Sequence, residues 1–246
     1  MKYDIIGDIH GCYDELIHLF FDLGYKQENG LYLHDEGRIP VFLGDITDRG
    51  PNSVQTISLV YHLLEQQKAM YVPGNHCNKL YRYFLGNPVQ IAHGLETTVA
   101  ELQQQPRKKQ QTIRQQFMTI YENAPLYLEL PEVNVVVAHA GIKASYIGRH
   151  DKKTKSFVLY GEPTGKFDYR GMPVRLDWAK DYHGQRWIVY GHTPVKTPRQ
   201  VNHTINIDTG CVFGNALSAF RLPEKEIVSI PSRQPYVPDK FTVFEG

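Results

Sequence analysis

Five short polar motifs hold the residues of this chain that are best suited to bind metal ions. Each motif comes directly after a run of apolar residues with the composition of a β-strand. The motifs are Gly7-Asp8-Ile9-His10-Gly11, Gly44-Asp45-Ile46-Thr47-Asp48-Arg49-Gly50, Gly74-Asn75-His76-Cys77, His139-Ala140-Gly141 and Gly191-His192-Thr193-Pro194. Because the same arrangement recurs at the end of each strand-like run, we expect the five motifs to converge on one site.

The candidate ligands in these motifs are two carboxylates, one amide oxygen and three imidazoles. They belong to Asp8, His10, Asp45, Asn75, His139 and His192. This mixture of nitrogen and oxygen suits Mn, Fe, Co, Ni or Zn rather than Ca or Mg. One ion takes about three or four protein ligands, so six candidates indicate two ions. If one carboxylate bridges them, the ions lie roughly 3.5 to 4 Å apart, the spacing of two-metal sites for phosphoryl chemistry.

The elements that position the motifs alternate between strand-like and helix-like segments. Residues 13–23 carry apolar side chains at helical spacing and end at Gly24, which predicts a helix packed on a sheet. A second helix is expected after Pro51, since proline favours the first helical turn. The chain therefore begins as an α/β fold built from strand-loop-helix units.

Three later segments have their own expected structures. Residues 79–123 are helix-like and lie between the third and fourth motifs, so they can form a helical cap over the site. The basic segment from Gly148 to Gly171 is expected to be loop-rich, and either a solvated surface or a substrate lid. The alternating apolar residues after Thr204 predict antiparallel strands that complete a second sheet.

Length and composition favour one soluble α/β domain over residues 1–246. The hydrophobic share of 41% and charged share of 22% are ordinary for a globular chain. A formal net charge of +1 excludes the broad basic field that non-specific nucleic-acid binding needs. A strand is expected within a few residues of Met1, which leaves no room for a signal peptide and predicts a cytoplasmic protein without a membrane segment.

The motif set G-D-I-H-G, G-D-I-T-D-R-G, G-N-H, H-A-G and G-H-T-P resembles the calcineurin-like metallophosphoesterases, in their phosphoprotein-phosphatase branch. The phrases G-N-H-C-N-K-L-Y-R-Y, F-V-L-Y-G and P-V-R-L-D-W-A look most like the bacterial asymmetrical bis(5'-nucleosyl)-tetraphosphatases of the PrpE type. The resemblance implies a four-layer α/β/β/α sandwich with two mixed sheets and a helical cap insertion at about 79–123.

The same resemblance implies a role for each motif residue. It assigns one ion to Asp8, His10 and Asp45, and the other to Asp45, Asn75, His139 and His192, with Asp45 bridging. His76 is implied as the general acid, oriented by Asp48, and Arg49 and Arg175 as the residues that grip phosphate. Cys77 departs from the family, because many relatives carry an acidic residue there that can polarise its neighbours.

The implied activity is metal-dependent hydrolysis of diadenosine tetraphosphate and related dinucleoside polyphosphates to ATP and AMP. Two divalent transition-metal ions are expected, with Ni or Mn ahead of Co, Fe and Zn. A phosphoprotein phosphatase acting on phospho-Ser, phospho-Thr or phospho-Tyr stays an alternative, because the metal ligands contact only the reacting phosphate and not the rest of the substrate. A non-catalytic nucleotide-binding module is a further, less favoured alternative. The sequence leaves the physiological metal, the oligomeric state and the pathway open.

Overall fold

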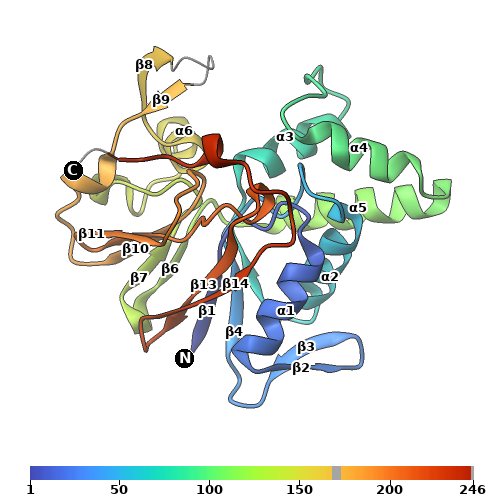
Figure 1. Ribbon diagram of the computed structural model, residues 1–246, viewed down its shortest axis with the longest axis horizontal. Coiled ribbons are helices and arrows are strands. Elements are labelled where there is room, and N and C mark those ends of the chain that lie inside the picture. The colour runs from blue at the N-terminus through green and yellow to red at the C-terminus, as the bar shows by residue number, and fades with distance from the viewer. Residues whose placement is uncertain (168–172, 245–246) are drawn as a thin grey trace.

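Within residues 1–167 and 173–244, the part of the chain that the structure describes, two five-stranded sheets lie face to face (Figure 1). The structure is a computed structural model. The first sheet has the order β14-β13-β1-β4-β5, formed by β1 (Tyr3–Ile6), β4 (Ile39–Phe42), β5 (Met70–Tyr71), β13 (Ala216–Leu222) and β14 (Glu226–Pro231). β1, β4 and β5 are parallel to one another, whereas β13 is antiparallel to β1 and to β14, so this sheet is mixed.

The second sheet has the order β11-β12-β10-β7-β6. Its strands are β6 (Leu128–Leu130), β7 (Val135–Val137), β10 (Trp187–Tyr190), β11 (Arg199–Val201) and β12 (Thr204–Asn206). The three inner strands are parallel, and each edge strand is antiparallel to its neighbour. This sheet is mixed as well.

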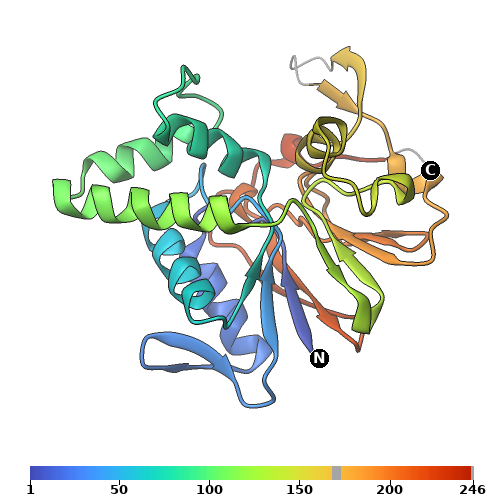
Figure 2. The same ribbon diagram turned by 180° about the vertical axis from the view of Figure 1, so that it is seen from behind.

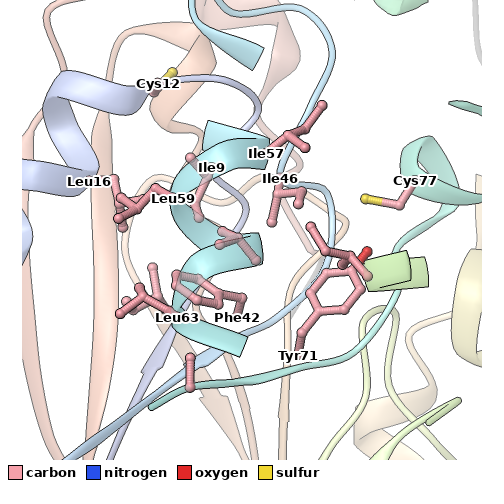
Figure 3. Close-up of a cluster of buried hydrophobic side chains, with 14 of the residues drawn as sticks. Ile9, Cys12, Leu16, Phe42, Ile46, Ile57, Leu59, Leu63, Tyr71 and Cys77 are labelled. Atoms are coloured by element: carbon pink, nitrogen blue, oxygen red, sulfur yellow. The ribbon is translucent and has the colours of Figure 1, made fainter. Parts of the chain in front are cut away.

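Helices α1 (Tyr13–Leu23) and α2 (Ser53–Glu65) cover the outer face of the first sheet. The expected helix over residues 13–23 is confirmed, and it ends at Gly24 in the left-handed conformation with φ 94°. Leu16, Phe42 and Leu63 meet in the cluster of apolar side chains that joins these helices to the sheet (Figure 3). Burial of such side chains is the main stabilising term for this layer.

A second cluster fills the space between the sheets, and a third covers the far face of the second sheet. Ile5 faces the inter-sheet cluster while Ile6 faces the helices, as the alternation of strand side chains requires. On the second sheet, Val136 and Ile188 pack against helix α6 (Lys152–Tyr160). The order of layers is helix, sheet, sheet, helix, which confirms the α/β/β/α sandwich (Figure 2).

Three helices occupy the segment between the third and fourth motifs. They are α3 (Asn75–Phe84), α4 (Leu95–Gln103) and α5 (Arg107–Asn123). The first helix begins at Asn75 itself rather than near Lys79, because the extended Gly74 stands directly before it. α5 packs on α2 and α3, with the rings of Phe84 and Phe117 5.7 Å apart.

The prediction that the tail completes the second sheet is wrong for its two longest strands. β13 and β14 join the first sheet, where Tyr3 pairs with Leu222. The reason lies in the two faces of β13: Leu217 belongs to the cluster under the helices, and Phe220 to the cluster between the sheets. A strand that is apolar on both faces fits the interior of the sandwich.

The basic segment after Gly148 is also more regular than expected. Asp151 accepts a hydrogen bond from Thr154 N at 2.9 Å and so caps α6. β8 (Pro163–Phe167) and β9 (Pro173–Arg175) form a hairpin beyond it, and residues 168–171 of the expected segment lie outside the described residues. A further hairpin joins β2 (Tyr25–Glu28) and β3 (Leu31–His34). No helix in the described part of the chain is long and apolar enough to cross a bilayer.

Candidate metal centre

The five motifs follow strands that end at the same edge of the sandwich. β1 and β4 are parallel, as are β7 and β10, so the loops after them leave from the same end of each sheet. Backbone hydrogen bonds tie neighbouring loops together: His10 N donates to Asp45 O at 2.8 Å, and Gly191 N donates to His139 O at 2.8 Å. The topology therefore delivers the motif side chains to one place.

Several residues of these loops have a strained backbone conformation. His10, Asp45, Asp48, Arg49 and His192 all have positive φ angles, of 48°, 26°, 74°, 71° and 71°. Residues other than glycine adopt this region at a cost of roughly 1–3 kcal/mol each, and such residues cluster at functional sites. The surrounding fold must hold these five side chains against that cost.

Two glycines allow backbone to approach the carboxylates closely. A Cβ on Gly74 would lie 2.0 Å from Asp45 Oδ1, and one on Gly191 would lie 2.2 Å from Asp8 Oδ1. No larger residue fits at either position without displacing a candidate ligand. The glycines of the third and fifth motifs are thus required for packing around Asp45 and Asp8.

Four candidate ligands surround one point. His139 Nε2 lies 3.1 Å from Asn75 Oδ1, 3.3 Å from Asp45 Oδ2 and 3.2 Å from His192 Nδ1. His139 Nδ1 lies 3.0 Å from Leu43 O and donates to it, which leaves Nε2 with a lone pair. Four electron-rich atoms therefore face one another, an arrangement that a cation between them would stabilise.

The side-chain oxygen of Asn75 tests this interpretation. In the structure it faces only acceptors. Turning the amide over would let its nitrogen donate to His192 Nδ1 and Asp45 Oδ2, at 2.8 and 3.2 Å. The turned amide would also point its oxygen, the only neutral oxygen among the candidate ligands, away from them. Since Asn75, Asp45 and two imidazoles together are a donor set for a transition-metal ion, the residues fit a metal.

The charge at this point also favours a cation. Burial raises the pKa of Asp45, but His139 and His76 outweigh burial and hold that pKa well below its usual value. Burial lowers the pKa of His139, whereas Asp45 and Asp8 raise it, to about 9. The two carboxylates thus create a negative potential that draws positive charge to His139.

Asp45 belongs to a second group of candidate ligands. One ligand atom each from His10, Asp45 and His76 lie within 4.8 Å of one another, as do those of Asp45, His139 and His192. His10 Nδ1 lies 2.8 Å from Thr47 O, which leaves its Nε2 for a metal. A carboxylate shared by two groups is the arrangement that bridged ions require.

The carboxylate of Asp8 contacts the backbone of the fifth motif. His192 N is 3.3 Å from both of its carboxylate oxygens, and Asp8 Oδ2 is 3.9 Å from His139 Nδ1. Burial, followed by the charge of Asp208, raises its pKa well above the usual value. Its place beside His10 in the first ion's ligand set stays a prediction.

His76 and Asp48 form a buried pair next to the ligands. His76 Nδ1 lies 2.8 Å from Asp48 Oδ2, and His76 N donates to Asp45 Oδ1 at 2.9 Å. The hydroxyl of Thr98 donates to the other Asp48 oxygen at 2.7 Å. Asp48 N lies 3.1 Å from the hydroxyl oxygens of Ser53 and Thr98. Thr98 of α4 therefore holds the carboxylate of Asp48, and Ser53 of α2 and Thr98 together hold its backbone N–H.

The two predicted phosphate-binding arginines stand beside different ligands. Arg49 Nη1 lies 2.9 Å from His10 Nε2, and its Cζ lies 5.5 Å from the centre of the Phe213 ring. Arg175 is close enough to His192 to lower the pKa of that imidazole, after burial and His139. Their guanidinium groups can form forked hydrogen bonds with phosphate oxygens.

Sequence reasoning missed two buried residues of this region. Asp208 follows β12, accepts from Gly210 N at 3.0 Å, and has its pKa raised to about 6, chiefly by burial. It stands just after a strand, like the motif residues, and that position could have identified it. Thr98 lies in α4, and no pattern in the sequence connects it with Asp48.

Cys77 does not face His76. Its thiol lies in the apolar cluster near Ile46 and Tyr71, and burial raises its pKa to about 12 (Figure 3). An acidic residue at this position would lie in the hydrophobic core. The side chain of Cys77 therefore contributes to the packing of this cluster.

Comparison with known proteins identifies the family of the chain. Residues 1–206 match the family model of the calcineurin-like phosphoesterases. The chain belongs to this family. The family's fold and its metal chemistry agree with the sandwich and with the donor set described above.

Members of the family with similar sequences match over the whole length. A bis(5'-nucleosyl)-tetraphosphatase PrpE [asymmetrical] from Oceanobacillus iheyensis is 61% identical over 99% of this chain and 98% of its own. The protein of the same name from a Geobacillus species is 60% identical over all of both chains. A crystal structure of a candidate diadenosine tetraphosphatase superimposes with a TM-score of 0.64 and 25% identity, over 94% of this chain and 93% of that one.

Proposed function

We propose that this protein is a bis(5'-nucleosyl)-tetraphosphatase that hydrolyses diadenosine tetraphosphate asymmetrically to ATP and AMP. The observation that carries the proposal is 61% identity, over almost the full length, to a relative named for this activity. The buried donor set around Asp45 and the adjacent His76–Asp48 pair supply the chemistry that hydrolysis of a phosphoanhydride needs.

Two divalent ions would be held by the motif residues. Asp45 would bridge them, with Asp8 and His10 completing one site. The other site would consist of Asp45, Asn75, His139 and His192. When bound, such a pair supplies a water molecule of lowered pKa and neutralises charge on the reacting phosphate. Nitrogen and oxygen ligands suit Mn, Fe, Co, Ni and Zn alike, and we take Ni and Mn as the first candidates to test, followed by Co, Fe and Zn.

The protein's own side chains would perform the remaining steps. Asp48 accepts from His76 Nδ1 and so leaves Nε2 to hold a proton for the departing phosphate oxygen. Arg49 and Arg175 would orient the phosphoryl oxygens and stabilise the charge that builds on them. His139 and His10 are kept in one orientation by backbone carbonyls, which supports a rigid site.

Product analysis tests the proposal. The purified protein is incubated separately with diadenosine tetraphosphate and with a phosphopeptide, each with Mn, Ni, Co or Zn. We expect ATP and AMP in equal amounts. Two ADP per substrate would mean symmetrical cleavage, and phosphate release from the peptide alone would favour the phosphoprotein-phosphatase alternative. A cytoplasmic location and the absence of a nucleic-acid partner stay predictions from the sequence.

A further inference from the structure

Helix α3 leads away from the candidate metal centre to an arginine without an assigned role. The helix begins at Asn75, and Asn78 and Arg82 follow at three and seven residues. Residues at these spacings lie on one face of a helix. At a rise of 1.5 Å per residue, Arg82 lies about 10 Å along the helix axis from Asn75.

Tyr160, the last residue of α6, reaches the same face of α3. Its hydroxyl lies 3.5 Å from Asn78 Oδ1, and Asn78 in turn donates to the hydroxyl of Tyr121. The contact brings together two helices that are 82 residues apart between Asn78 and Tyr160. Figure 1 shows α3 and α6 at the same end of the sandwich. Tyr160 is only partly buried, and its contact with Asn78 places its hydroxyl on the face of α3 that leads from Asn75 to Arg82.

Two arginines lie near this hydroxyl. Burial raises the pKa of Tyr160, while the charges of Arg82 and Arg175 lower it and that of Asp45 raises it. A Cβ on Gly161, next in the chain, would lie 4.0 Å from Arg175 Cδ. The order of groups is therefore Asp45 at the metal centre, then Tyr160 with Arg175, and Arg82 beyond them on α3.

These cations have no acidic partner in the described part of the chain. No carboxylate there lies within 4.0 Å of a guanidinium nitrogen of Arg82 or Arg175. Arg82 is exposed and Arg175 is partly buried. On the side of the site next to His10, Arg49 Nη1 contacts His10 Nε2, and Arg49 Cζ and Lys240 Nζ lie 5.5 and 5.7 Å from the centre of the Phe213 ring. The α3 side differs in length, because Arg82 lies about 10 Å along the helix axis from Asn75.

For asymmetrical cleavage, the two sides of the metal centre must bind phosphate chains of different length. Breaking the chain between the first and second phosphates leaves one phosphate on one product and three on the other. We infer that Arg82 and Tyr160, together with Arg175, bind the distal phosphates of the triphosphate product and so set the point of cleavage. This inference rests on the proposed function, and it places the triphosphate part of the substrate along α3.

Kinetics on two substrates test the inference. Arg82→Gln removes the distal charge, and Arg107→Gln, at the exposed first residue of α5, is the matched control. One substrate is diadenosine tetraphosphate, and the other is bis(p-nitrophenyl) phosphate, which has no distal phosphates. Losing a hydrogen bond to a charged group should lower kcat/KM for the tetraphosphate about 10-fold, mainly through KM. The second substrate should be unaffected, and Arg82→Lys should restore part of the loss.

Tyr160→Phe should cause a smaller loss of the same kind, since only the hydroxyl is removed. Equal losses on both substrates, or no loss on the tetraphosphate, would overturn the inference while leaving the proposed function in place. If the wild-type protein released no ATP and AMP, the proposed function would fail and the inference with it. Because the wild type alone reports that outcome, the two failures are distinguishable.

Discussion

His76 Nδ1 lies 2.8 Å from Asp48 Oδ2, and both side chains are buried. The pair joins the second motif to the third and stands directly beside Asp45, whose carboxylate accepts from His76 N. An imidazole held through Nδ1 presents Nε2 in one fixed direction. The geometry therefore separates a ligand from its neighbour in sequence: Asn75 faces the other candidate ligands, and His76 faces Asp48.

Replacing His76 by Asn should lower kcat by about 10²- to 10⁴-fold, the usual contribution of a positioned general acid. Metal content should stay at the wild-type value, because Asp45, Asn75, His139 and His192 are unchanged. Elemental analysis and steady-state kinetics on diadenosine tetraphosphate check both points. His62→Asn, an exposed histidine on α2, is the control and should behave as wild type. Loss of one ion from the His76 variant would show that His76 is a ligand.

Replacing Thr98 by Val should weaken the support of Asp48 from α4. The change leaves a buried carboxylate oxygen and a buried N–H with fewer partners, which costs about 1–3 kcal/mol of stability. We expect a lower kcat and a shifted pH profile, with little change in KM, because His76 would lose its fixed orientation. Thr98→Ser keeps the hydroxyl and should restore both. An unchanged pH profile in the Val variant would mean that Asp48 is held without Thr98.

Replacing Gly74 by Ala should reduce metal binding. The new Cβ would lie 2.0 Å from Asp45 Oδ1 and 2.6 Å from Asp45 N, so the shared carboxylate must move. Metal titration followed by calorimetry should show weaker binding at both ion sites. Gly148→Ala is the control: no atom lies within 4 Å of its added Cβ, and its φ of 83° makes the change a test of backbone strain alone. That variant should lose stability but keep its metal affinity.

Replacing Cys77 by Asp should destabilise the fold. The thiol is fully buried in the apolar cluster with Ile46 and Tyr71. A carboxylate there would lose its hydration without a charged partner, at a cost of at least about 2 kcal/mol. Burial would raise the pKa of the new carboxyl above its unfolded value, so the loss should grow as the pH rises above about 4. Urea unfolding at several pH values measures this, with Cys77→Ala as the uncharged control.

Local patterns in the sequence predicted the elements that depend on neighbouring residues. The helical spacing from Leu16 to Leu23 and the stop at Gly24 correspond to α1 residue for residue. The placement of β13 could not be obtained in this way. Its partner β1 lies more than 200 residues earlier, as Tyr3 opposite Leu222 shows, and alternation alone does not tell which sheet a strand joins.

By itself, the sequence determined the family, the sandwich class and the types of ligand that follow the strands, because short motifs of neighbouring residues are enough to identify all three. Only the tertiary structure decided which atoms meet. Asp45 is shared by two ligand groups because parallel strands bring their loops to one edge. Cys77 points into the core while His76 faces Asp48, because α3 begins at Asn75 and successive helical residues turn by about 100°. Thr98 reaches Asp48 because α4 packs against α2, a contact that no local pattern records.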